Sequence, residues 1–123
     1  MDKNKTRIGR QGEEAAAAFL QKKGYRILER NFRLAYGEID IIAQDGSFLV
    51  FVEVKLRQDD DYGSGEEAIN KRKIAHIEKV GEYYATLHPE LPQALRIDVL
   101  VIGPKDKKGK PKIRLFKNVQ QDF

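Results

Sequence analysis

The amino-acid sequence predicts a single α/β domain in which helices flank a mixed central β-sheet of about five strands. Its length of 123 residues suits one domain. Segments with helical and strand-like patterns follow one another in the order helix, three strands, helix, two strands. A sheet built by strands on both sides of a helix in the chain is typical of mixed α/β architectures.

Two segments carry the helical signal. The first helix is expected over residues 8–23, because the alanines at 15–18 favour helix and Gly24 is a natural C-cap. Residues 1–7 before it are expected to form a flexible basic lead-in. The second helix is expected over residues 66–87, where apolar or small residues recur at helical spacing. These residues are Ile74, Ile77, Val80, Gly81, Tyr84 and Leu87.

Strands are expected at residues 25–32, 95–102 and 113–116, with a basic loop over residues 104–112. Two further strands form a strongly apolar hairpin over residues 37–55. The dipeptide Asp45-Gly46 lies between its arms and is a preferred hairpin turn. Both faces of the hairpin are largely apolar, as expected for central strands that helices cover on both sides.

The hairpin carries charges that are costly to bury without compensation. If Asp45 and Gly46 are the two central turn residues, Asp40 faces Phe51, and Glu38 faces Glu53. Asp40 and Glu53 are then diagonal neighbours, about 7–8 Å apart. Alternation along the strands places these three acidic residues and Lys55 on the same face. Carboxylate oxygens in such an arrangement suit a divalent metal ion of the size of magnesium.

Composition narrows the function classes. The net charge of +4 and the pI of about 9.3 permit nucleic-acid binding without demanding it. The absence of cysteine excludes disulfides and thiolate zinc sites. His76 and His88 are too far apart for a histidine-rich metal site. Without a signal peptide or an apolar stretch that could span a membrane, we expect a cytoplasmic protein.

Several motifs together resemble a known family. An acidic residue on a first helix, then an aspartate, then Glu-X-Lys on the next strand is similar to the core of PD-(D/E)XK nucleases, which have the restriction-endonuclease-like fold. The closer resemblance is to the YraN family of bacterial proteins, which is similar to archaeal Holliday-junction resolvases. It covers nearly the whole chain. The stretches that carry it are 9–13, 24–25, 30–33, 37–40, 51–55, 57, 63–68 and 96–98.

The resemblance implies a role for each motif residue. Asp40 and Glu53 would bind magnesium or manganese, and Lys55 would lie near the attacking water or the scissile phosphate. Glu13 would help to hold the metal or a water, which agrees with its helical spacing to inward-facing residues. The proline that often precedes the aspartate is replaced by Ile39, a change that removes no ligand. The implied activity is hydrolysis of DNA phosphodiesters, and a homodimer is permitted.

Basic residues would hold the DNA backbone without reading its sequence. Since no base-reading motif is present, we expect recognition of branched or otherwise structured DNA. The candidate contacts are Arg7, Arg10, Arg33, Arg57, Lys71, Arg72 and Lys73.

Simpler interpretations stay open. Glu38 could be an exposed acid or lie behind the metal ligands, and Glu13 could merely favour its helix N-terminus. The lysines at 71–73 could form a solvated helix face, and Asp98 could pair with Arg96. The alternative function is a non-catalytic nucleic-acid-binding module with the nuclease fold. A third is a protein-interaction adaptor that uses the acidic loop at residues 59–61.

Overall fold

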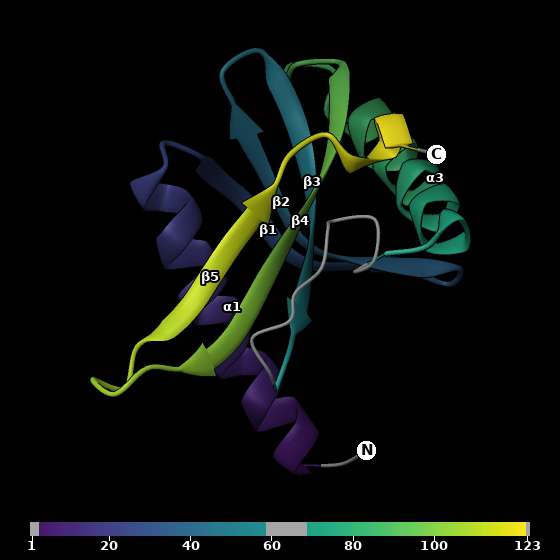
Figure 1. Cartoon of the computed structure of the whole chain (residues 1–123). Helices are drawn as coiled ribbons and strands as arrows, with labels where there is room; N and C mark the ends of the chain where they lie inside the picture. Colours follow the sequence, from purple (N-terminus) through teal and green to yellow (C-terminus); the bar gives the residue numbers. More distant parts are fainter. Residues whose placement is uncertain (1–2, 59–68, 123) are drawn as a thin grey trace.

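The fold is known from a computed structural model, which describes residues 3–58 and 69–122 (Figure 1). Five strands form one mixed sheet in the order β1-β2-β3-β4-β5. Neighbouring strands are antiparallel except β3 and β4, which are parallel. The predicted α/β class with a five-stranded mixed sheet is therefore confirmed. The elements are α1 (Lys3–Lys22), β1 (Arg26–Leu34), β2 (Gly37–Asp45), β3 (Phe48–Leu56), α3 (Lys71–Leu87), β4 (Ala94–Lys105), β5 (Pro111–Phe116) and the 3-10 helix η1 (Val119–Asp122).

The sheet is covered on both faces. Figure 1 shows α1 and α3 on opposite sides of it, and the buried side chains divide into two clusters accordingly. Under α1 the strands contribute Ile41, Ala43, Val50, Val52 and Leu100. Under α3 they contribute Ile39, Ile42, Leu49, Phe51 and Val99. The central strand β3 is thus apolar on both faces, as a strand in the middle of a two-sided core must be. Ile39 departs from the alternation that the sequence predicts, since it packs under α3 together with Ile42.

The helix α3 connects the two parallel strands. A parallel pair needs a crossover connection, and α3 supplies it between β3 and β4. Its start is fixed by Asn70, whose side chain accepts a hydrogen bond of 2.9 Å from the Lys73 backbone N–H. The helix therefore begins at Lys71, whereas the sequence predicted residue 66; of that earlier segment, residues 66–68 lie outside the described part.

The predicted register of the β2–β3 hairpin was wrong by two residues. Asp45 pairs with Phe48, so the central turn residues are Gly46 and Ser47. Gly46 has a φ of +59°, and a positive φ at the first central position is what a type II′ turn requires. Ile41, Ile42, Leu49, Val50, Phe51 and Val52 keep their predicted faces, whereas Ile39 does not. Asp40 lies one residue beyond the pair of Ile41 and Val52, the last pair of this ladder.

Other boundaries differ in smaller ways. The first helix begins at Lys3, so residues 3–7 are helical instead of a loose lead-in. The expected basic loop at 104–112 shrinks to a turn between Lys105 and Pro111, because β4 and β5 extend into it. Leu87, expected in the buried stripe of α3, is 52% exposed. None of the described helices combines the length and the hydrophobicity that crossing a membrane would require.

Candidate functional site

Two carboxylates meet where the β2–β3 ladder ends. The ladder pairs Ile41 with Val52 as its last rung on this side. Beyond it, Asp40 Oδ2 accepts a hydrogen bond of 2.8 Å from the Val54 backbone N–H. This contact ties the Asp40 side chain to the strand that carries Glu53. Asp40 and Glu53, which the sequence predicts at one site, are therefore neighbours in the structure.

Glu53 is the more deeply buried of the two, with 6% of its surface exposed. Its Oε1 lies 3.8 Å from Lys55 Nζ, and its Oε2 lies 3.7 Å from Lys73 Nζ. Both separations are too long for hydrogen bonds. Among the described residues, Oε2 of Glu53 finds no hydrogen-bond donor. A buried carboxylate oxygen in this condition is unusual and needs an explanation.

The electrostatics reflect this crowding. Burial raises the pKa of Glu53 to about 7; the neighbouring Asp40 raises it too, while Lys73 and Lys55 lower it. Burial also raises the pKa of Asp40, the bond from Val54 lowers it, and Glu38 and Glu13 raise it further. The charge of Asp40 raises the pKa of Glu53, and the charge of Glu13 on α1 raises the pKa of Asp40. The three carboxylates are therefore close enough to interact electrostatically.

Glu13 and Glu38 lie at the margin of this site. Glu13 is half-buried on α1 and accepts a hydrogen bond of 3.0 Å from the side chain of Asn31 in β1. Glu38 pairs with Arg33 across the β1–β2 hairpin, with Arg33 Nε 3.1 Å from Glu38 Oε2. The expectation that Glu38 faces Glu53 was wrong, because the β2–β3 register is shifted by two residues from the predicted one and the ladder ends at Ile41 and Val52.

The candidate DNA contacts are spread out. Arg10 is exposed on α1, and Lys71 and Arg72 are exposed on the first turn of α3. Arg57 is half-buried beside a pocket of about 570 Å³ that is also lined by Lys105. Among the candidates whose side chains are described, Lys73 is the one that lies beside Glu53. Side chains up to residue 8 lie outside the description, so Arg7 is not placed.

The fit of this site to a metal ion can be tested on its donors. No group of three or more His, Cys, Asp or Glu side chains in the described ranges is arranged to hold an ion by itself. Magnesium, however, often binds proteins through one or two carboxylates and keeps its waters. Asp40 and Glu53 supply such a pair, and the unbonded oxygen of Glu53 is a free ligand atom. The residues therefore fit a divalent cation whose remaining ligands come from substrate or water.

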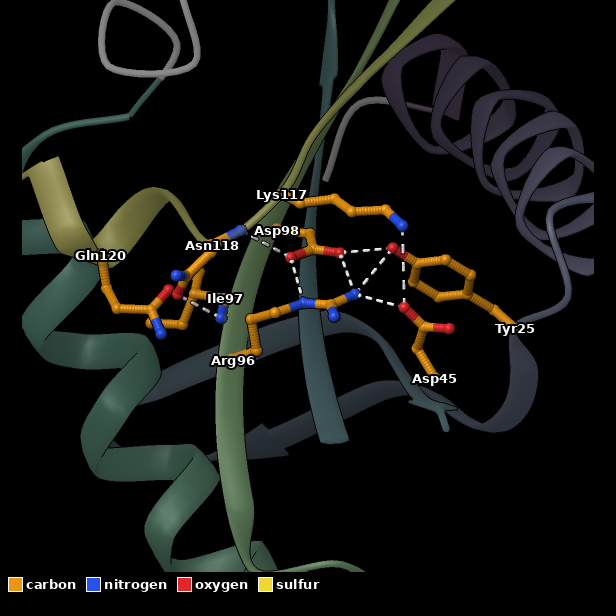
Figure 2. A network of polar contacts seen from close by, with 8 residues as sticks. All are labelled: Tyr25, Asp45, Arg96, Ile97, Asp98, Lys117, Asn118 and Gln120. Atoms are coloured by element: carbon orange, nitrogen blue, oxygen red, sulfur yellow. Dashed lines mark hydrogen bonds and ion pairs between the residues drawn. The ribbon is translucent and has the colours of Figure 1, made fainter. Parts of the chain in front are cut away.

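A second polar cluster lies at the other end of the hairpin, on the α1 face (Figure 2). Arg96 and Asp98 project from β4 and are 8% and 0% exposed. Arg96 Nε donates to Asp98 Oδ1 at 3.0 Å, and Arg96 Nη2 donates to Asp45 Oδ2 at 2.8 Å. The Tyr25 hydroxyl donates to Asp98 Oδ2 at 2.7 Å and accepts from Arg96 Nη2 at 2.8 Å. The Asn118 backbone N–H donates to Asp98 Oδ1 at 2.9 Å.

This cluster satisfies its own hydrogen bonds. The sequence suggested the Arg96–Asp98 pair, and the structure confirms it. The sequence did not indicate that Tyr25 and Asp45 join this pair, since both come from segments far away in the chain. Burial and the bond to Asp98 raise the pKa of Tyr25, which keeps its hydroxyl protonated as the donor. Lys117 Nζ also lies 3.7 Å from Asp45 Oδ2, so two cations face the two carboxylates and the cluster holds the fold together.

Comparison with known proteins gives a consistent result. The family model described as "Uncharacterised protein family UPF0102" matches residues 12–102. A UPF0102 protein of Syntrophomonas wolfei is 44% identical over 103 residues, which cover 84% of this chain and 90% of that protein. One of Caldicellulosiruptor saccharolyticus is 43% identical over 115 residues, covering 94% and 98%. One of Carboxydothermus hydrogenoformans is 40% identical over 116 residues, covering 94% and 97%.

Proposed function

Because the chain belongs to UPF0102, the YraN family, and carries a buried glutamate beside a half-buried aspartate, we propose that it is a divalent-cation-dependent endonuclease that hydrolyses DNA phosphodiesters. The observation that carries the proposal is Glu53, a buried carboxylate beside Asp40 with one oxygen free of hydrogen bonds. This oxygen is buried, and the ammonium of Lys73 lies 3.7 Å from it, too far for a hydrogen bond. A cation-binding role explains why a buried carboxylate oxygen has so weak a partner.

The ion would be held by Asp40 and Glu53. Magnesium or manganese fits because hard cations prefer carboxylate oxygens. Bound there, it would lower the pKa of a water and neutralise charge on the phosphate. Since burial and the neighbouring Asp40 raise the pKa of Glu53, a bound cation would favour the charged forms of both carboxylates.

The remaining residues would position the substrate. Lys55 projects from the same strand as Glu53, two residues further on, and its ammonium lies 3.8 Å from Glu53 Oε1. A compact positive charge there can bind a phosphate oxygen. Glu13, held by Asn31, could accept a hydrogen bond from a water at the site. Exposed basic residues on α1 and α3, such as Arg10, Lys71 and Arg72, would hold the backbone on either side.

The substrate we propose is branched or otherwise structured DNA. The basic side chains are scattered over the surface instead of lining one base-reading element, so they suit phosphate contacts and recognition of shape. A symmetric dimer would present two such sites to a branched substrate. A cytoplasmic location goes with this substrate.

The test is nicking of junction, flap and linear DNA with magnesium or manganese. We expect Asp40→Asn and Glu53→Gln to lower the rate by roughly 100-fold or more, as loss of a group that stabilises developing charge does. The control is Glu14→Gln, since Glu14 is an exposed acid on α1 paired with Arg30, and its rate should equal that of the wild type. Circular dichroism would check that each variant is folded.

Two outcomes would overturn the proposal. If the wild type cleaves none of these substrates but binds them with a steep salt dependence, the chain is the non-catalytic DNA-binding module. If it neither cleaves nor binds DNA, the nucleic-acid interpretation fails.

A further inference from the structure

Glu53 is shared between two lysines, one for each oxygen. Lys55 approaches Oε1 to 3.8 Å from β3 itself, and Lys73 approaches Oε2 to 3.7 Å from α3. The lysine of the nuclease motif explains the first contact. The second belongs to no motif and comes from an element that begins beyond the hairpin.

The position of Lys73 is built into the fold. Asn70 caps α3 by accepting a hydrogen bond from the backbone N–H of Lys73, which fixes the first turn of the helix. The next residue, Ile74, is 4% exposed and anchors that turn in the core. Lys73 is therefore half-buried, with 36% of its side chain exposed, whereas Lys71 and Arg72 on the same turn are exposed.

The ammonium of Lys73 lies at the oxygen that a cation would use. Oε2 of Glu53 has no hydrogen-bond donor among the described residues, which makes it the available ligand atom. A magnesium ion would sit about 2.0–2.1 Å from it. An ammonium 3.7 Å from the same oxygen would then face a doubly charged ion at close range and in a partly buried setting, where repulsion is weakly screened.

We propose that Lys73 is a tethered competitor for the divalent cation at Glu53, and that it must withdraw before the cation can bind. This inference rests on the proposed cation site. Lys73 neutralises Glu53 while the site holds no ion, and its exposed part leaves it room to swing toward solvent. A DNA phosphate near α3 would attract the withdrawn ammonium. DNA and cation would then each tighten the binding of the other, because such coupling is reciprocal.

The experiment is a calorimetric titration of magnesium into the full chain at pH 8.5, where protons compete less for Glu53. We expect Lys73→Met to bind magnesium about 10-fold more tightly than the wild type. Lys73→Arg keeps the charge and should bind like the wild type. Lys79→Met removes an exposed lysine from the same helix and should also leave the affinity unchanged. Glu53→Gln should abolish binding.

The outcomes separate the two proposals. If the wild type binds magnesium, Glu53→Gln does not, and Lys73→Met binds no more tightly than the wild type, Lys73 is not a competitor while the cation site stands. If Glu53→Gln binds as the wild type does, or if no variant binds, the cation site itself is rejected and the inference with it. Binding by Lys73→Met alone would support the competition in its strongest form.

Discussion

At the scale of single residues, Glu53 is the group whose protonation matters most. Burial raises its pKa to about 7 from an ordinary value of 4.5. The native state therefore holds this proton more tightly than the unfolded chain does. The resulting stabilisation is complete below about pH 4.5 and is lost as the pH rises through 7. Glu53 should thus make the metal-free protein less stable in mildly alkaline solution than in acid.

Glu53→Gln should remove this dependence, because glutamine resembles the protonated acid. We expect the variant and the wild type to be equally stable at pH 4, and the variant to be more stable by about 1–3 kcal/mol at pH 8. Urea unfolding in the presence of EDTA would measure the difference. A variant that is less stable than the wild type at pH 8 would mean that the two lysines more than offset the cost of burying the charge.

The main residues of the carboxylate pair were predictable from the sequence. Asp40 and Glu53 are neighbours despite the register error of two residues, because Asp40 bonds the backbone of β3 next to Glu53. The role of Lys73 was not predictable. Its place depends on where α3 begins and on how the crossover between β3 and β4 packs against the sheet. Neither follows from the basic run at residues 71–73, which is typical of a solvent-exposed helix face.

At the scale of elements, α3 packs on β3 through a glycine. A Cβ atom built on Gly81 would lie 2.7 Å from two ring atoms of Phe51, which is 1% exposed. The helix can approach the central strand this closely because no side chain intervenes. The sequence placed Gly81 in the buried stripe correctly, but it could not show which ring fills the space.

Gly81→Ala tests this close approach. Alanine normally stabilises a helix interior relative to glycine, yet here we expect a loss of about 1–3 kcal/mol, because the methyl group overpacks the core. Chemical denaturation would measure it. Gly81→Ala combined with Phe51→Leu frees space and should be less destabilised than the sum of the single variants. A single Gly81→Ala variant that is more stable than the wild type would contradict the packing.

At the scale of the whole molecule, the Arg96 cluster joins distant segments. It links Tyr25 after α1, Asp45 at the end of β2, Asp98 in β4 and Asn118 after β5 (Figure 2). The sequence could suggest only the Arg96–Asp98 pair, since two residues on one face of a strand are neighbours in any fold. The other partners meet only once the sheet order and both helices are in place.

Arg96→Leu should therefore destabilise the entire domain by about 3–5 kcal/mol, because it leaves Asp98 charged and buried without its partner. Arg96→Leu with Asp98→Leu should be less destabilised than the single variant, since it removes the stranded charge as well. Thermal and urea unfolding of both would measure this. Equal losses in the two variants would show that the charge of Asp98 is tolerated alone.

The parallel pairing of β3 with β4 also bears on the order in which the chain assembles. The β2–β3 hairpin closes over two residues, whereas β4 can join β3 only after the whole crossover has been organised. Loop closure costs more entropy for the longer connection. We expect a nucleus of local strand pairs to bring Asp40 and Glu53 face to face before Lys73 arrives. Their mutual repulsion would then raise the folding barrier, and Lys73 would relieve it only after the barrier has been crossed.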